Sequence, residues 1–154
     1  MDLSDLISPE AILGSLKANS KKQAIQALSE KAAAVTGLEE REIIDTLLQR
    51  ERLGSTGVGG GIAIPHGKLA KLGRIVGLFA RLARPIDFEA LDDQPVDLVF
   101  LLLAPEGAGA DHLKALARIA RLLREPGIAG KLRAATDKSA LYAVLTASAT
   151  PHAA

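Results

Sequence analysis

The chain has 154 residues, and 19 lysines and arginines against 18 aspartates and glutamates give a formal net charge of +1, so no overall field favours nucleic acid or an anionic membrane. Aromatic residues make up 3% of the chain, which leaves no stacking surface for bases, and the lack of cysteine excludes disulfides and thiolate chemistry. A hydrophobic content of 48% at this length predicts one domain with its own core.

The N-terminus and the apolar runs bear on location. The first seven residues open acidic and lack the basic start and long apolar segment of a signal peptide. The longest apolar run, residues 98–105, is too short to span a bilayer. We therefore expect a cytoplasmic protein without direct membrane insertion. Residues 147–154 have no pattern, and we expect them to form a disordered tail behind a domain over residues 1–146.

Two helices are predicted in the first third of the chain. Ser20 and Gln23 have the spacing of a capping box, and apolar residues recur behind them at helical spacing until Gly37. A second helix ends before Gly54. Its apolar face is formed by Ile43, Ile44, Leu47 and Leu48.

Strand-like segments occupy the middle of the chain. Residues 62–65 form a short apolar run, and residues 74–83 place apolar side chains on one face and on most of the other. Residues 85–88 are typical of a short edge segment. Residues 97–104 are almost all apolar, which indicates a central strand buried on both faces. These segments predict a mixed sheet of about four to five strands.

Three further helices are predicted after residue 105. Asp111 can cap the first of them, after a loop over residues 105–110. Pro126 is expected in the first turn of a short helix that runs to about residue 134. Thr136 or Asp137 caps a last helix through Leu145. Helices before and after the strands predict a single-domain α/β fold with helices on both faces of the sheet.

His66 is the most informative residue of the chain. Pro65 precedes it and favours an extended backbone, and Gly67 leaves the imidazole without a bulky neighbour on that side. Upstream, residues 54–61 are so rich in glycine that we expect something to approach this loop closely. A neutral imidazole held in this way is a candidate nucleophile or general base. The alternative is a loop histidine that merely caps a helix.

Other chemistries lack their motifs. The glycine-rich segment has neither the lysine and hydroxyl residue of a phosphate loop nor a dinucleotide fingerprint. No Gly-x-Ser-x-Gly elbow and no His-Glu-x-x-His zinc motif is present. His66 and His112 could meet in space, with Glu106 or Asp111 nearby, but a metal needs three or four such ligands. The sequence therefore predicts neither nucleotide binding nor a metal site.

Three residues could act together: His66, His112 in the helix after the buried strand, and Arg50 at the end of the second helix. In an α/β layer fold, strand ends and helix N-termini meet on one rim, where ligands usually bind. A nucleophilic nitrogen, a donor and a guanidinium there suit phosphoryl transfer to histidine. Taken singly, Arg50 is typical of a solvated helix end and His112 of a helix surface, and Lys68 is better suited to partner docking than to catalysis.

The segment from Arg50 to Lys68, with its Arg-Glu-Arg-Leu-Gly-Ser-Thr-Gly start and its Pro-His-Gly end, resembles the active-site segment of a known family. These are the mannitol/fructose-type enzyme IIA domains of the phosphoenolpyruvate-dependent phosphotransferase system, and the nitrogen-regulatory class is the most similar. Residues 85–100, 112–116 and 131–142 agree with it. The resemblance extends from about residue 3 to residue 145, so residues 1–146 are identified as an enzyme IIA domain.

The resemblance implies roles for four residues. His66 would accept a phosphoryl group on Nε2 from a small HPr-like phosphocarrier protein, and His112 would bind the phosphoryl group or His66. Arg50 and Ser55 would bind phosphate or steady the loop. No metal or organic cofactor is expected. The chain would be a phosphotransferase component, a phosphohistidine relay that regulates nitrogen- or potassium-related partners such as transporters and sensor kinases.

Two departures from the family and two alternative functions follow. Several members have asparagine at the position of Gly60, and threonine often stands where this chain has Asp111. We expect the carboxylate of Asp111 to raise the pKa of His112.

One alternative function is an enzyme IIA component that passes phosphate to a sugar-specific IIB partner. Another is an interaction module whose histidine is never phosphorylated.

Overall fold

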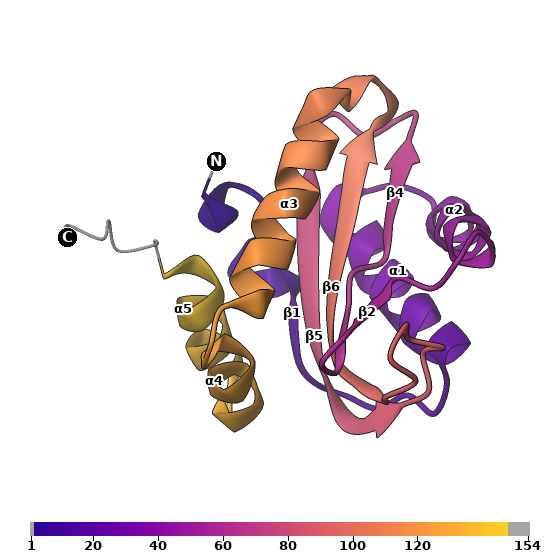
Figure 1. Cartoon of the computed structure of the whole chain (residues 1–154). Coiled ribbons are helices and arrows are strands. Elements are labelled where there is room, and N and C mark those ends of the chain that lie inside the picture. The colour runs from indigo at the N-terminus through magenta and orange to yellow at the C-terminus, as the bar shows by residue number, and fades with distance from the viewer. Residues whose placement is uncertain (1, 148–154) are drawn as a thin grey trace.

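The computed structural model describes residues 2–147 (Figure 1). Within this range six strands form one mixed sheet in the order β1-β5-β6-β3-β2, and β4 also pairs with β6. The strands are β1 (Ile12–Leu16), β2 (Gly57–Gly59), β3 (Ile62–Ala63), β4 (His66–Leu69), β5 (Val76–Ile86) and β6 (Val96–Pro105). The helices are α1 (Lys21–Thr36), α2 (Glu40–Arg52), α3 (Ala110–Arg124), α4 (Ile128–Ala134) and α5 (Lys138–Thr146). Short 3₁₀ turns lie at Leu3–Asp5, Pro9–Ala11 and Glu106–Ala108.

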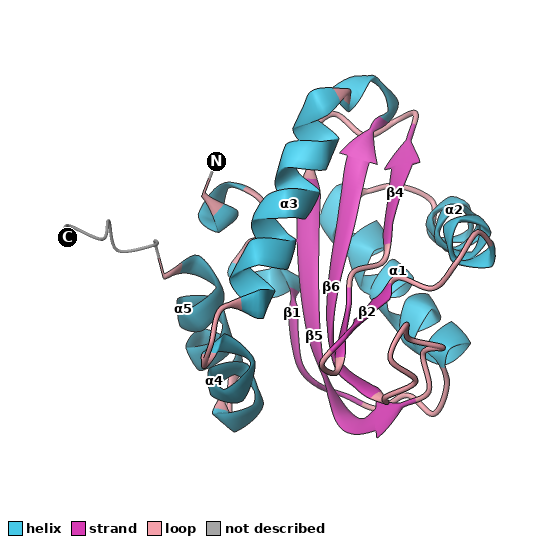
Figure 2. Cartoon of the chain, in the orientation of Figure 1, coloured by secondary structure: helices cyan, strands magenta, loops and turns pink. Residues whose placement is uncertain are grey.

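Helices cover both faces of the sheet. In Figure 2, α1 and α2 lie on one side of the strands, and α3, α4 and α5 lie on the other. The predicted α/β class with a mixed, doubly covered sheet is therefore confirmed. The sheet has more strands than expected because β1 and β2 are too short to be recognised from the sequence. β2 consists of Gly-Val-Gly, which shows no strand pattern.

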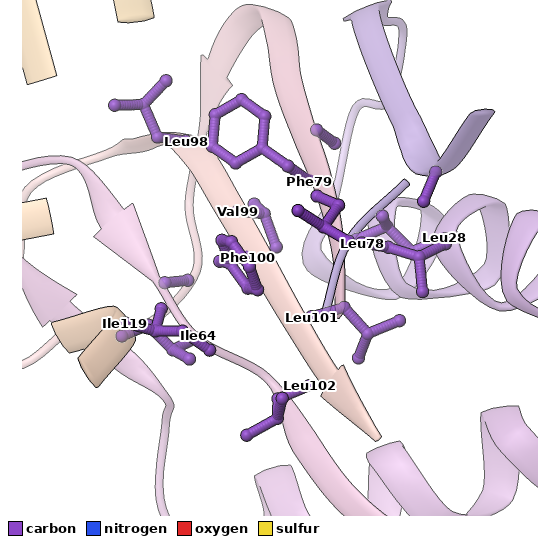
Figure 3. Close-up of a cluster of buried hydrophobic side chains, with 14 of the residues drawn as sticks. Leu28, Ile64, Leu78, Phe79, Leu98, Val99, Phe100, Leu101, Leu102 and Ile119 are labelled. Atoms are coloured by element: carbon purple, nitrogen blue, oxygen red, sulfur yellow. The ribbon is translucent and has the colours of Figure 1, made fainter. Parts of the chain in front are cut away.

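The central strand is β6, which pairs antiparallel with β5 and parallel with β3 and β4. Residues 98–104 are all fully buried, as the apolar run predicted. Figure 3 shows Leu28 of α1 beside Leu78 on one face and Ile119 of α3 beside Ile64 on the other. Burying each such side chain contributes about 1.5–3 kcal/mol to folding. The packed core therefore holds the strands and the covering helices in fixed positions.

The helix ends follow the predicted capping chemistry in two places. Ser20 Oγ accepts a hydrogen bond from Gln23 N at 3.2 Å, while the Gln23 side chain accepts from Asn19 N rather than from Ser20 N. Gly37 ends α1 in the left-handed conformation, with φ of 77°. At α5, Asp137 Oδ1 accepts from Ala140 N at 2.8 Å, as one of the two predicted caps.

Three expectations about element ends are wrong. α3 begins at Ala110, two residues earlier than a cap at Asp111 allows, because Gly109 takes the N-cap position with φ of 55°. Pro126 precedes α4, since Gly127 takes that N-cap position with φ of 87°. Residues 85–88 do not form a separate edge strand because β5 continues through Ile86. The tail predicted at 147–154 lies, apart from Ala147, outside the described residues. In residues 2–147, no helix combines the length and the apolar character needed to cross a bilayer.

Candidate active site

His66 is the first residue of β4, where the chain re-enters the sheet after β3. The prediction placed it at the end of a strand, but β3 stops at Ala63, and Pro65 O accepts a hydrogen bond from Leu102 N at 2.9 Å before β4 begins. β4 then runs parallel to β6, with His66 opposite Leu102. The central strand therefore sets the position of the imidazole.

The two ring nitrogens of His66 have different partners. Nδ1 lies 2.9 Å from the carbonyl oxygen of Ile64, so Nδ1 holds the proton and donates it. Nε2 then has a lone pair, and it accepts a hydrogen bond from Arg50 Nε at 3.3 Å. Arg50 is anchored by a second bond, from Nη1 to the carbonyl oxygen of Gly54 at 2.9 Å. The tautomer is the one in which Nε2 can act as a nucleophile.

His112 lies beside this ring, in the first turn of α3. The two imidazole centroids are 5.6 Å apart, with the planes tilted by 49°. His112 is 6% exposed, and its Nδ1 has no hydrogen-bond partner within residues 2–147. The structure thus brings together the three residues that the sequence predicted to converge, namely His66, His112 and Arg50.

Both imidazoles are biased toward the neutral form. Burial is the main cause that lowers the pKa of His66, and Arg50 lowers it further, while the bond to Ile64 O and the charge of Glu51 oppose this. Burial, His66 and Lys68 lower the pKa of His112. The expected rise from Asp111 is wrong: burial, His66 and Lys68 act on the His112 ring, while the Asp111 side chain is exposed.

The glycine-rich loop needs its glycines both for its backbone conformation and because other parts of the chain approach it closely, as expected: a Cβ at Gly57 would lie 2.7 Å from Ala90 Cβ. Gly59, Gly60 and Gly61 have φ of 107°, 67° and 81°, a region in which other residues are strained. Gly60 is held on both sides, because its N–H donates to Asp92 Oδ2 at 3.0 Å and its carbonyl accepts from Arg133 Nη2 at 2.8 Å. The αL conformation of Gly60 is also one that asparagine tolerates.

Ser55 lies in the same loop, and its hydroxyl is engaged within the protein. Ser55 Oγ donates to the carbonyl oxygen of Phe88 at 2.6 Å and accepts from Gly57 N at 3.0 Å. These bonds shape the turn that follows α2. A role for Ser55 in phosphate binding stays a prediction.

Gly67 has a packing role that differs from the expected one. A Cβ at this position would lie 2.7 Å from Thr46 Cγ2 of α2. The glycine therefore lets α2, which lies next to β4 in Figure 1, pack closely against the strand. That close packing brings Arg50 within reach of His66.

Sequence reasoning missed Glu51, a carboxylate buried behind the site. Glu51 is 8% exposed and accepts hydrogen bonds from the backbone N–H and the hydroxyl of Thr56, and it pairs with Lys21 Nζ at 2.8 Å. One signal could have found it. Glu51 stands four residues after Leu47, which stands four after Ile43, so it falls on the buried face of α2.

The described residues include no group of three or more histidine, aspartate or glutamate side chains placed to hold a metal ion. The arrangement is suited to an anion, because a half-buried imidazole nitrogen with a lone pair, one guanidinium and a second imidazole lie close together. A phosphoryl group is an anionic group that both accepts a nucleophile and binds to a guanidinium.

Comparison with known proteins identifies the family. The family model for the phosphoenolpyruvate-dependent sugar phosphotransferase system, EIIA 2, matches residues 5–148. The chain belongs to this family. A nitrogen regulatory protein from Bradyrhizobium diazoefficiens is 70% identical over 145 residues, which are 94% of this chain and 95% of that protein. A fructose-specific EIIA component from Haloferax volcanii is 36% identical over 149 residues, 94% of this chain and 97% of that one.

A solved structure agrees with these relatives. The crystal structure of the nitrogen regulatory protein IIA-Ntr from Neisseria meningitidis superposes with a TM-score of 0.89 at 32% identity, and the match covers 94% of this chain and 99% of that one. The enzyme IIA family and its nitrogen-regulatory class, both predicted from the motif around His66, are therefore confirmed.

Proposed function

We propose that this enzyme IIA domain accepts a phosphoryl group on Nε2 of His66 from an HPr-like phosphocarrier. The observation that supports this most directly is the tautomer: Nδ1–H is bound to Ile64 O, so Nε2 carries a lone pair, which lies beside Arg50. Burial keeps the pKa of His66 low, which keeps that lone pair available near neutral pH. The proposed compartment is the cytoplasm.

The transfer needs no net movement of protons. The Nε2 lone pair attacks phosphorus, and the N–P bond of the carrier's phosphohistidine breaks as the new bond forms. The electron pair of the broken bond returns to the carrier's ring. Nδ1 of His66 keeps its proton throughout, and that proton stays hydrogen-bonded to the carbonyl oxygen of Ile64. The protein's task is to position the groups and to stabilise charge on the phosphoryl oxygens.

Arg50 and His112 are the residues that supply this stabilisation. The guanidinium of Arg50 lies next to Nε2, and a small rotation would direct its N–H groups at the oxygens of a phosphoryl group bound there. The His112 ring, whose centroid lies 5.6 Å from that of His66, can also donate from a ring N–H. Lys68, exposed on β4, adds positive charge at the entrance.

The phosphorylation state of His66 would in turn regulate partner proteins. The relatives named as nitrogen regulatory proteins support this proposal, and the partners that it implies are nitrogen- or potassium-related transporters and sensor kinases. A phosphoryl group changes the local charge by about −1.5 to −2 near neutral pH, enough to make or break an interface around His66.

A second candidate is an enzyme IIA component that passes phosphate to a sugar-specific IIB partner. The observation that favours it is the match to a fructose-specific EIIA component along nearly the whole of both chains. The two functions share the first step, phosphorylation of His66. They differ in whether phosphate moves on to a IIB protein or stays as a signal.

The experiment is phosphorylation with phosphoenolpyruvate, enzyme I and an HPr-like carrier, measured by intact mass at alkaline pH because phosphohistidine is acid-labile. We expect wild type to gain one phosphoryl group, His66→Ala to gain none, and His112→Ala to retain some acceptance. Adding a IIB protein for fructose then tests onward transfer. A folded wild-type chain that gains no mass beside a competent carrier would contradict the relay and favour a phosphate-independent interaction module.

A further inference from the structure

We infer that Glu51 is a positioning residue for His66, acting through Thr56 and Ile64 and held in place by Lys21. No residue of this set other than His66 belongs to the predicted site. The kinetic part of the inference rests on the proposed function. Its structural part, the orientation and tautomer of the His66 ring, stands without phosphorylation and can be measured separately.

Glu51 is unusual because it is a carboxylate inside the protein. Its side chain is 4% exposed, and one oxygen accepts from Thr56 N at 3.0 Å and from Lys21 Nζ at 2.8 Å, while the other accepts from the Thr56 hydroxyl. Burying a carboxylate is costly, and a buried ion pair gives little net stability over apolar residues. Such a pair is more readily explained by the geometry it enforces than by stability.

A continuous chain of hydrogen bonds leads from Glu51 to the nucleophile. Glu51 fixes Thr56 through both its backbone N–H and its hydroxyl. The carbonyl oxygen of Thr56 accepts from Ile64 N at 2.9 Å. The carbonyl oxygen of Ile64 in turn accepts from His66 Nδ1 at 2.9 Å. A shift at Thr56 therefore moves the acceptor that selects the tautomer of His66.

The other ring nitrogen is linked to Glu51 by the backbone. Arg50, which donates to His66 Nε2, is the residue before Glu51 at the last turn of α2. Anchoring the Glu51 side chain against the loop thus also fixes the end of the helix that holds Arg50. Both nitrogens of the imidazole are positioned from one carboxylate.

Lys21 brings a third segment to the same point. It is the first residue of α1, and its ammonium lies 2.8 Å from Glu51 Oε1, 3.6 Å from Glu89 Oε1 and 5.1 Å from the centroid of the Phe88 ring. The carbonyl oxygen of Phe88 also accepts a hydrogen bond from the hydroxyl of Ser55. The start of α1, the end of α2 and the loop at 87–89 therefore meet at the Glu51 carboxylate.

The charge of Glu51 also acts on the ring. The titratable and charged groups around His66 are Arg50 and Glu51 from α2, His112 from α3, and Lys68 from β4 beside His112. Glu51 is the negative member of this set and raises the pKa of His66 against burial and Arg50. When Nε2 bonds to phosphorus and Nδ1 keeps its proton, the ring becomes cationic, and Glu51 stabilises that charge.

The test compares Glu51→Gln with Glu89→Gln. The Glu51→Gln change keeps the size of the side chain but removes its charge, whereas Glu89, 76% exposed on its side chain, contacts Lys21 from outside the hydrogen-bond chain. Nitrogen-15 NMR of the His66 ring in the unphosphorylated proteins gives its tautomer and its pKa. In Glu51→Gln we expect a lower His66 pKa and a population with the proton on Nε2. We expect Glu89→Gln to match wild type.

The kinetic readout uses the carrier-dependent phosphorylation rate. Because misplacement by a fraction of an ångström weakens a reaction that depends on positioning, we expect about a tenfold fall in kcat for Glu51→Gln with little change in the KM for the carrier. A purely structural loss would instead reduce the folded fraction and leave the His66 tautomer of the remaining folded protein unchanged. That outcome would overturn the inference.

Thr56 provides a second variant should Glu51→Gln fail to fold. Thr56→Val keeps the Glu51–Lys21 pair and the backbone N–H but removes the hydroxyl donor, and Thr56→Ser retains it. We expect a mixed His66 tautomer in Thr56→Val and the wild-type tautomer in Thr56→Ser. A wild-type NMR signature in Thr56→Val would refute the positioning role. A wild-type chain that shows the expected tautomer but takes no phosphate would refute only the proposed function.

Discussion

Arg50 Nε lies 3.3 Å from His66 Nε2, so the guanidinium donates a hydrogen bond to the lone pair that, in the proposed function, attacks phosphorus. The unphosphorylated site therefore holds the proposed nucleophile in contact with the guanidinium that we propose binds the phosphoryl group. Under this proposal Arg50 turns away before the bond to phosphorus forms, and its second hydrogen bond, to Gly54 O, keeps it nearby. The contact thus orders the imidazole and keeps the guanidinium ready for the incoming anion.

The first prediction concerns the arrangement of the N–H donors on the Arg50 guanidinium rather than its charge. Arg50→Lys keeps the cation but cannot direct two N–H groups at a phosphoryl group while anchored to the loop. We expect the rate of His66 phosphorylation to fall about 100-fold, the usual effect of losing one aimed donor in a transition state. Quenched-flow intact mass gives the rate. Arg52→Lys, an exposed change two residues away, is the matched control, and equal rates in the two variants would contradict the role of Arg50.

The second prediction is the pH dependence of phosphorylation. A protonated His66 has no lone pair on Nε2, and burial sets its pKa below the ordinary histidine value of 6.5. We therefore expect the rate to be constant above pH 6.5 and to fall only as the pH drops through the lowered pKa. Initial rates from about pH 8 to about pH 5, with a carrier already phosphorylated, give the profile. A midpoint at or above 6.5 would show that the ring is not held neutral.

The third prediction follows from the same pKa directions and concerns folding. The pKa values of His66 and His112 are lower in the folded chain than in the unfolded chain, so the unfolded state binds protons first as the pH falls. The free energy of unfolding should decrease from above pH 6.5 down to the folded pKa values. Urea unfolding of wild type and of the double variant His66→Gln/His112→Gln measures this, and we expect the variant to show a flatter pH dependence. An equally steep dependence in the variant would assign the effect to other groups.

The sequence predicted elements whose signal is local. β6 can be recognised from its own residues, because a strand buried on both faces is apolar along almost its whole length. The caps at Ser20 and Asp137 depend on side chains that bond to their own helix. The convergence of His66, His112 and Arg50 was predicted from the layer architecture, although His66 begins β4 rather than following the end of β3 directly.

Features set by distant contacts were not predictable. β1 is a strand because it pairs with β5, which lies far along the chain, and its own sequence Ile-Leu-Gly-Ser-Leu does not alternate. From sequence alone, Glu51 is one charge among several in α2, and its role depends on Lys21 and Thr56, which reach it from other segments. The pKa of His112 was predicted from its neighbour Asp111, but burial and the groups across the site decide it.

The fourth prediction tests how closely α2 must approach β4. In Gly67→Ala the new Cβ would lie 2.7 Å from Thr46 Cγ2, so the helix must move away from the strand. We expect a loss of about 1–3 kcal/mol in unfolding free energy and, in the folded protein, a weaker Arg50–His66 contact seen as a higher mobility of the Arg50 Nε signal by NMR. Gly73→Ala is the control, because a Cβ there meets nothing within 4 Å. Equal stability of the two variants would show that the gap can be filled without cost.

The fifth prediction concerns the clamp on the glycine-rich turn before His66. Arg133 of α4 donates to both oxygens of Asp97 at 2.8 and 2.9 Å, and its Nη2 also donates to Gly60 O at 2.8 Å. The hydrogen bond to Asp97 raises the pKa of Arg133, which shows that this contact favours the charged guanidinium. A helix on the far side of the sheet thus fixes the turn that leads into β3 and the site.

A double-mutant cycle separates this clamp from the packing of α4. Arg133→Met keeps most of the apolar stem and removes the fork, and Asp97→Asn removes the charge while keeping the size of the side chain. Because the Arg133 side chain is 39% exposed, solvent weakens the pair, and we expect a coupling of about 1 kcal/mol in unfolding free energy. Raising the salt concentration should reduce this coupling, since exposed charges are screened. Additive effects at low salt would mean that the turn at Gly60 keeps its shape without the ion pair.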